Sequence, residues 1–183
     1  MSPKPHMVAN RDHSFQFGRG TTAVLLIHGL TGTPSEVKAV GRSIADAGYC
    51  VYGVQLAGHC GTEADLLETS WQDWLDSSLV AFDEIRRKHE VVFVGGLSMG
   101  ALLALLVAAR RPEDVAGCIL YSPTMFYDGW SVPRASLLLH RLPAHVAAVD
   151  LLAHLLRIVG AAQRIVAIDL IGPILQVGAV RLR

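Results

Sequence analysis

The chain has 183 residues, 51% of them hydrophobic and 17% charged, and its formal net charge is +0. This length and composition are typical of one domain with a sizeable core, and the balanced charge argues against a nucleic-acid surface. Residues 1–12 hold no apolar run of the kind found in secretory signals. No uninterrupted apolar stretch reaches the roughly 18 residues of a membrane span. We therefore expect a cytoplasmic domain.

The first predicted elements alternate between buried strands and a helix. Residues 22–27 (TAVLLI) lack polar alternation, which predicts a strand buried on both faces. A glycine-rich turn, residues 28–32 (HGLTG), follows it. Pro34 suits the first turn of the next helix, which we expect to end near Gly48. Residues 50–54 are the second predicted strand.

The alternation continues after a loop at residues 58–62 (GHCGT). Ser70 is the predicted N-cap of a helix, and one face of that helix carries six apolar residues expected to pack in the core: Trp71, Trp74, Leu75, Leu79, Phe82 and Ile85. Residues 91–95 and 118–121 are further predicted strands, separated by a strongly apolar helix at 99–110. Strands separated by helices predict an α/β fold with a mainly parallel, doubly wound sheet.

The composition changes after about residue 130. Residues 131–183 contain no Thr, Asn, Glu, Lys, Cys, Met or aromatic residue. A helix over 146–158 and a strand over 164–171 fit the pattern there. Two explanations stay open: a helical cap or unusual tail, or an out-of-frame translation of the true C-terminal half. We divide the single domain into an N-terminal extension (1–16), a core (17–130) and this atypical segment, and expect the sheet to be incomplete on its C-terminal side.

The sharpest chemical signal is the pattern G-x-S-x-G at residues 96–100 (GLSMG), between a predicted strand and an apolar helix. In that context it is typical of a nucleophile elbow, a tight turn that holds a serine in a strained conformation with its hydroxyl exposed. Gly96 and Gly100 relieve the crowding of such a turn. The helix that begins at Met99 directs backbone N–H groups toward the reacting centre. Ser98 is therefore the predicted nucleophile.

An earlier turn supplies a second element of the same chemistry. An oxyanion needs two converging donors, one from the residue after the nucleophile and one from the loop after an earlier strand. The Met99 N–H fits the first role, and the Leu30 N–H fits the second. His28 and Gly29 support that loop, and His28 is interpreted as structural because it precedes the turn.

Four segments occur in the order found in one superfamily: residues 24–37 (VLLIHGLTGTPSEV), 58–62 (GHCGT), 71–74 (WQDW) and 95–100 (GGLSMG). They resemble the bacterial carboxylesterases and monoacylglycerol-lipase-like members of the α/β-hydrolase superfamily, over about residues 17–130. The resemblance implies an α/β-hydrolase fold and a serine hydrolase that cleaves short- to medium-chain acyl esters or monoacylglycerols through an acyl-enzyme on Ser98. It implies a small-molecule ester substrate and no cofactor.

The loop at 58–62 departs from the family pattern at one position. By resemblance His59 is a structural or site-edge residue, and Cys60, which stands where the family usually has glycine, is interpreted as a bystander thiol. The three cysteines, Cys50, Cys60 and Cys118, are widely spaced and match no zinc pattern. We expect buried or free thiols in a reducing compartment and no metal centre. The oligomeric state has no signature in the sequence.

The larger departure concerns the rest of the catalytic triad. The family places an acid and then a histidine after later strands. Asp169 follows a predicted strand, but no histidine follows it, and Asp150 stands too close to His154 to leave room for a strand and a helix. Asp128 has three candidate partners that lack the expected strand-end context: His140, His145 and His154. The acid and the base are therefore unassigned.

Two hypotheses remain. The chain is a serine hydrolase of carboxylic esters, or it is a catalytically inactive or truncated α/β-hydrolase-like protein that lacks the triad Asp and His. A serine hydroxyl without a base is a poor nucleophile, so a functional base near Ser98 separates the two. Only under the first hypothesis does Ser98→Ala abolish turnover.

Overall fold

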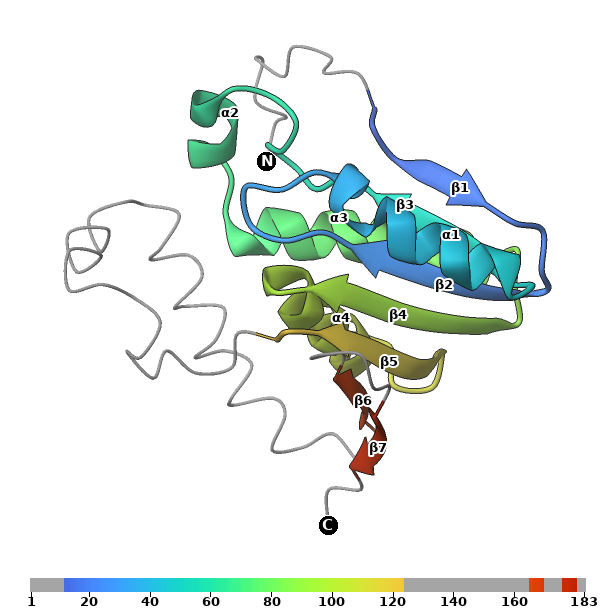
Figure 1. Ribbon diagram of the computed structural model, residues 1–183. Helices are drawn as coiled ribbons and strands as arrows, with labels where there is room; N and C mark the ends of the chain where they lie inside the picture. The colour runs from blue at the N-terminus through green and yellow to red at the C-terminus, as the bar shows by residue number, and fades with distance from the viewer. Residues whose placement is uncertain (1–11, 124–164, 170–175, 181–183) are drawn as a thin grey trace.

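The computed structural model describes residues 12–123, 165–169 and 176–180 (Figure 1). Its main sheet has five strands in the order β1-β3-β2-β4-β5. These strands are β1 (Phe15–Phe17), β2 (Thr22–Ile27), β3 (Cys50–Val54), β4 (Val91–Leu97) and β5 (Val115–Tyr121). All neighbouring pairs are parallel except β1 with β3. The sheet is therefore mixed but mainly parallel, as the alternating pattern predicted.

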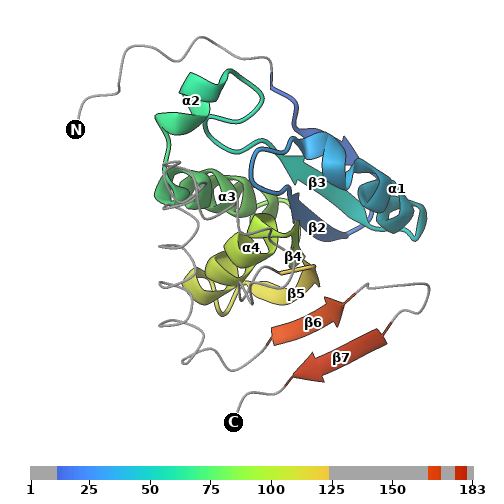
Figure 2. The ribbon, with the colours of Figure 1, turned by 60° about the vertical axis from the view of Figure 1, so that its left-hand side comes forward.

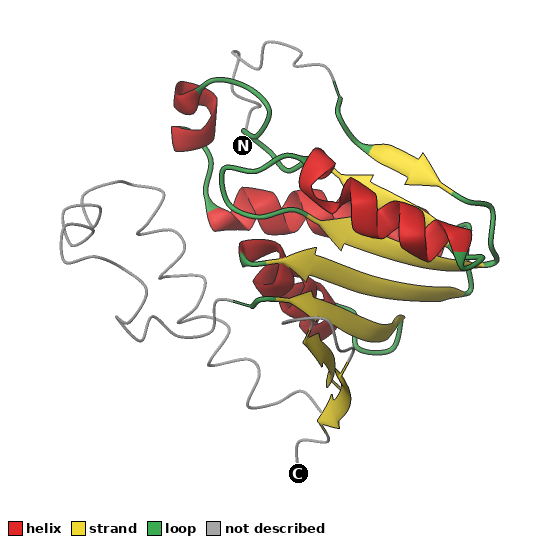
Figure 3. Cartoon of the chain, viewed as in Figure 1, coloured by secondary structure: helices red, strands yellow, loops and turns green. Residues whose placement is uncertain are grey.

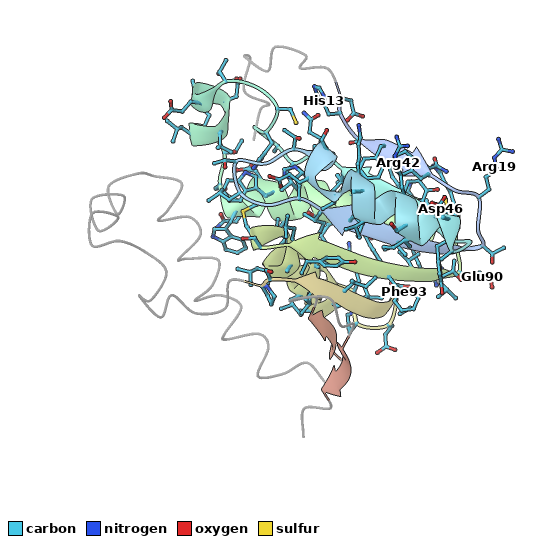
Figure 4. The ribbon with its side chains drawn as sticks, in the orientation of Figure 1. His13, Arg19, Arg42, Asp46, Glu90 and Phe93 are labelled. Carbon is cyan, nitrogen blue, oxygen red and sulfur yellow. The ribbon has the colours of Figure 1, made fainter. Side chains whose placement is uncertain are left out.

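Helices cover both faces of this sheet. The described helices are the 3-10 helix η1 (Pro34–Val37), α1 (Lys38–Asp46), α2 (Glu63–Leu67), α3 (Trp71–Arg86) and α4 (Met99–Arg110). Figure 2 shows α1 on one side of the strands and both α3 and α4 on the other. Arg42 projects from α1, where its guanidinium lies 5.1 Å from the centre of the Phe17 ring (Figure 4). The described core is thus doubly wound.

Strand β2 lies at the centre of two hydrophobic clusters. Its alternate residues Ala23, Leu25 and Ile27 belong to the cluster beneath α3 and α4. Val24 and Leu26 belong to the cluster beneath α1. All five are at most 2% exposed, which explains why the strand shows no polar alternation.

The predicted boundaries agree with the structure for several elements. Residues 22–27, 50–54 and 99–110 match β2, β3 and α4. Strand β4 continues to Leu97, and β5 begins at Val115 rather than at 118. The helix predicted from Pro34 is divided, with a 3-10 turn preceding α1.

Helix α3 agrees with its prediction in capping and in burial. The Asp73 carboxylate accepts hydrogen bonds from the Ser70 N–H at 2.8 Å and the Ser70 hydroxyl at 2.6 Å. Five of its six predicted core residues are buried, Trp74 and Phe82 among the deepest, while Leu79 is partly buried. The far end of the helix is tied down by Arg111, which forms a two-pronged ion pair with Asp83 at 2.9 and 2.7 Å. Because both tryptophans of α3 are buried in the hydrophobic core, they contribute to packing.

Three short elements were not predicted: β1, α2 and a strand at residues 176–180. β1 pairs Phe15 with Gly53 of β3, and a Cβ at Gly53 would overlap the Phe15 ring. This strand straddles the boundary at residue 16 that separated the extension from the core. α2 begins with a capping box in which Thr62 and Asp65 bond reciprocally.

Two further strands, β6 (Ile165–Asp169) and β7 (Gln176–Val180), pair antiparallel as a separate two-stranded sheet. β6 falls within the strand predicted over 164–171. The helix predicted over 146–158 lies outside the described residues.

The carboxyl ends of β2, β3 and β4 meet at one edge of the sheet. Ile27 pairs with Val54 on one side and with Gly96 on the other. Figure 3 shows in green the loops that leave β2 and β3 on the side to which the arrowheads point. In parallel α/β sheets this edge is where ligands bind. It places the predicted site residues in one neighbourhood.

Candidate active site

The Ser98 turn (residues 96–100) joins β4 directly to α4. Ser98 has φ 54° and ψ −115°, a backbone conformation that residues with a side chain rarely adopt. Its N–H donates to the Tyr121 carbonyl at 2.9 Å, and its own carbonyl accepts from the Ala101 N–H at 3.1 Å. Neighbouring structure therefore holds the strained serine in place, as strain at a functional site requires.

Two glycines make this turn sterically possible. A Cβ at Gly96 would overlap the backbone of Gly100, and a Cβ at Gly100 would overlap the carbonyl oxygens of Ile27 and His28. The start of α4 therefore packs against the end of β2 with backbone touching backbone. No larger residue fits at either position without moving main-chain atoms.

The glycine loop (residues 28–32) lies beside the Ser98 turn. A Cβ at Gly29 would stand 3.6 Å from the Leu97 carbonyl oxygen and 3.8 Å from the Ser98 Cβ. Among the described residues, no acceptor bonds the backbone N–H of Leu30 or of Met99. Both N–H groups belong to segments that adjoin Ser98. The structure thus brings together the two segments from which an oxyanion site would be drawn.

His28 fixes the glycine loop from inside the protein. It is fully buried; its Nδ1–H donates to the Gly29 carbonyl at 2.9 Å, and its Nε2 accepts from the Leu56 N–H at 3.4 Å. These partners, one acceptor and one donor, assign the neutral tautomer. Burial lowers the pKa of His28 to about 4. With both ring nitrogens engaged, His28 has no nitrogen left to take a proton from Ser98.

His59 connects the loop after β3 to the same region. Its Nδ1–H donates to the Ala57 carbonyl at 3.0 Å. Its ring stacks edge-on with His28 at 4.8 Å and with Trp74 at 5.4 Å. It is 3% exposed, and burial lowers its pKa. The rings of His28, His59 and Trp74 therefore pack in series and connect the glycine loop to the loop after β3.

Cys60 also has a left-handed backbone, with φ 65°. Its side chain is partly exposed, and partial burial raises the pKa of the thiol. A thiol with a raised pKa is a weaker nucleophile near neutral pH, because less of it is thiolate.

Of the two other described histidines, His13 precedes β1, where its backbone N–H donates to the Gln55 side chain at 2.7 Å, and His89 lies at the opposite edge of the sheet. His89 bonds the Tyr52 hydroxyl and the Thr21 carbonyl, each at 3.0 Å. Thr21 precedes β2, and Figure 4 shows neighbouring Glu90 at the end of the sheet away from the arrowheads. The candidates Asp128, Asp150, His140, His145 and His154 lie outside the described residues, as does the side chain of Asp169.

One contact in the site was missed by sequence reasoning. The Gly29 N–H donates to the carboxylate of Glu36 at 3.1 Å, across seven residues. An available signal was the acidic residue in the first helical turn after a glycine-rich loop, because the N–H groups of such a loop need acceptors.

Within the described ranges no cluster of three His, Cys, Asp or Glu side chains offers a metal site. In the same ranges, no helix has both the length and the apolar character needed to cross a bilayer.

Comparisons with known proteins place these features in a family. Residues 19–160 match the hydrolase family described as serine aminopeptidase, S33. A thermostable monoacylglycerol lipase from Bacillus sp. (strain H-257) is 35% identical over 105 residues, which cover 57% of this chain and 42% of that protein. A carboxylesterase from Bacillus subtilis (strain 168) is 30% identical over 113 residues, with 61% and 42% coverage. The chain spans about two fifths of the length of these curated relatives.

Solved structures agree on the fold. A structure reported for metagenome-derived lipolytic enzymes matches with a TM-score of 0.73 at 22% identity, over 85% of this chain and 74% of that one. The monoacylglycerol lipase of Paleococcus ferrophilus matches with a TM-score of 0.66 at 16% identity, over 87% and 77%. The family match continues to residue 160, past the predicted core boundary at 130. The chain belongs to the serine aminopeptidase S33 family of hydrolases and has an α/β-hydrolase fold, as the resemblance predicted.

Proposed function

We propose that this site hydrolyses carboxylic esters through an acyl-enzyme on Ser98. The observation that carries the proposal is the backbone of Ser98, held at positive φ at the N-terminus of a 12-residue helix beside a glycine-rich loop. A serine held in this way presents its hydroxyl above the sheet edge, where an acyl group can approach.

The reaction has two halves. The Ser98 oxygen attacks the ester carbonyl carbon as its proton passes to a base, and the N–H groups of Leu30 and Met99 hold the oxyanion. The tetrahedral intermediate collapses, the alcohol leaves with that proton, and the acyl group remains on Ser98. Water then attacks the acyl-enzyme, releasing the carboxylic acid and restoring the serine.

The substrate class comes from the relatives. Two of them are named a monoacylglycerol lipase and a carboxylesterase. We take short- to medium-chain acyl esters or monoacylglycerols as the substrates of this chain also. Within the described segments we identify no side chain that would set the preferred acyl chain length.

A second reading is an inactive or truncated hydrolase-like protein. The bonding of three described histidines favours it, because His28 and His89 use both ring nitrogens and His59 is buried with its Nδ1 committed. We look for the triad base of the proposed esterase outside the described residues, because the family brings it in after later strands. His140, His145 and His154 are its candidates.

The two readings separate in a kinetic experiment. We would measure hydrolysis of a p-nitrophenyl ester series, starting from the butyrate, by the purified chain, by Ser98→Ala and by Ser43→Ala as a surface-serine control on α1. The proposal expects turnover that falls by about 10⁵-fold or more in Ser98→Ala and stays within about two-fold in Ser43→Ala. Equal, near-background rates in all three would support the inactive reading.

A further inference from the structure

The side chain of Glu36 folds back from η1 onto the glycine loop. Its carboxylate accepts a hydrogen bond from the Gly29 N–H at 3.1 Å. A Cβ at Gly29 would stand 3.5 Å from the same carboxylate oxygen, and a Cβ at Gly32 would overlap it. The carboxylate therefore fills the inside of the loop, in space that two glycines leave open.

Together with two further hydrogen bonds, this contact fixes the two peptide planes on either side of Gly29. Glu36 holds the Gly29 N–H. The Gly29 carbonyl accepts from the His28 Nδ1–H at 2.9 Å and from the Gly32 N–H at 3.2 Å. The peptide unit that contains this carbonyl also contains the Leu30 N–H, and a trans peptide is planar with its N–H opposite its C=O. Fixing the Gly29 carbonyl therefore fixes the direction of the Leu30 N–H.

Gly29 would otherwise be the weak point of this arrangement. Glycine has the greatest backbone freedom of any residue, and the next residue but one, Thr31, is already at φ 60°. A loop free to rotate about Gly29 would turn the Leu30 N–H away from a developing charge. Preorganised donors contribute because they need no reorganisation during the reaction.

We infer that Glu36 is a positioning residue that orients the Leu30 N–H through its hydrogen bond to Gly29. The inference rests on the proposed function, since the Leu30 N–H matters only if an oxyanion forms beside Ser98. In this inference the carboxylate acts through the position of its oxygen, which the length of the Glu36 side chain places at the Gly29 N–H, and its negative charge is not needed.

Three substitutions separate geometry from charge. Glu36→Gln keeps an acceptor oxygen at the same reach, Glu36→Asp keeps the charge on a stem one methylene shorter, and Glu36→Ala removes both. We expect kcat to fall about ten-fold in the Asp and Ala variants, with KM nearly unchanged, and Gln to retain most of the wild-type kcat. Glu84→Gln, an exposed carboxylate on α3, is the control for lost charge.

Gly32 offers an independent way to move the same carboxylate. Because a Cβ there overlaps the end of the Glu36 side chain, Gly32→Ala must push the carboxylate out of the loop. We expect Gly32→Ala to lower kcat about as much as Glu36→Ala, and to add little in the double variant. Independent, multiplying effects would contradict the inference.

A merely structural role predicts a different order. If Glu36 only favours the N-terminus of its helix, Asp should equal Glu and Gln should be the poorer variant. That order, or a wild-type kcat in Glu36→Ala, would overturn the inference while the esterase proposal stood.

The amide resonances of Gly29 and Leu30 give a readout that needs no turnover. In ¹H–¹⁵N spectra we expect both to shift in Glu36→Ala and Glu36→Asp, and to shift much less in Glu36→Gln or Glu84→Gln. If the wild-type chain is inactive but shows this pattern, the esterase proposal fails and the loop contact stands. Unshifted Gly29 and Leu30 amides in Glu36→Ala would remove the basis of the inference, whatever the activity.

Discussion

Ser98 and Cys60 share an uncommon backbone but sit in opposite settings. Both have positive φ, 54° and 65°, at the same edge of the sheet and both carry a nucleophilic atom. Ser98 begins a 12-residue helix and is tied through its N–H to Tyr121. Cys60 lies in a loop two residues before the Thr62 cap of a five-residue helix, and partial burial raises the pKa of its thiol. Positive φ is therefore shared by the proposed nucleophile and by a loop cysteine, and what distinguishes Ser98 is the long helix that it begins and the glycine loop beside it.

A substitution at Gly100, where the start of α4 touches the end of β2, gives the largest expected effect on stability. Gly100→Ala places a Cβ against the Ile27 and His28 carbonyls, which are main-chain atoms that cannot yield. We expect the free energy of unfolding to fall by at least about 3 kcal/mol. Urea denaturation measures it.

Gly48→Ala is the matched control for this variant. Gly48 has φ 99° but open space around its Cβ position, so only the backbone strain of about 1 kcal/mol is expected. Equal losses in the two variants would mean that the close approach of α4 to β2 contributes nothing.

The buried histidines make the glycine loop sensitive to acid. The pKa of His28 falls from 6.5 to about 4 on folding, so between these values the unfolded chain binds a proton that the folded chain does not. Stability is therefore fully present above about pH 6.5 and is lost as pH falls toward 4, by up to about 3 kcal/mol.

A variant that cannot titrate at this position tests the assignment. His28→Asn can keep a donor toward the loop, and it should show a shallower loss of stability over the same pH range in thermal unfolding. A slope identical to that of the wild type would show that the acid sensitivity arises elsewhere, for example at His59, whose pKa is also lowered.

The thiols give the smallest expected effect. Burial raises the pKa of Cys118 to about 12, whereas the Cys60 thiol is partly exposed with a smaller rise. In the folded chain, iodoacetamide should modify Cys60 at least about ten-fold faster than Cys118. Peptide mapping measures the ratio. Faster labelling of Cys118 would contradict the packing of β5 against α4.

The main strands were predictable because a strand that is buried on both faces has apolar residues at successive positions. Residues 22–27 are apolar without alternation since each face of β2 meets helices. β1 was missed because three residues carry no periodicity, and its existence depends on Phe15 packing over Gly53. α2 was missed although its Thr62 and Asp65 spacing fits a capping box.

The parts of the site formed by residues adjacent in sequence were predictable, and the contacts between separate segments were not. The G-x-S-x-G spacing expresses a turn in which Gly96 and Gly100 touch backbone. The contact of Glu36 with Gly29 joins a helix to a loop that folds back on it, so no short motif encodes it. A triad acid and base would be hidden for the same reason, because a family of this kind brings them in from later strands.

Covalent labelling of the chain with a fluorophosphonate, followed by peptide mapping, tests most directly whether Ser98 is an activated nucleophile. We expect one phosphonylated residue, Ser98, and no labelling of the Ser98→Ala chain. An unlabelled wild-type chain that retains its folded spectrum, or a label on another serine, would contradict this expectation.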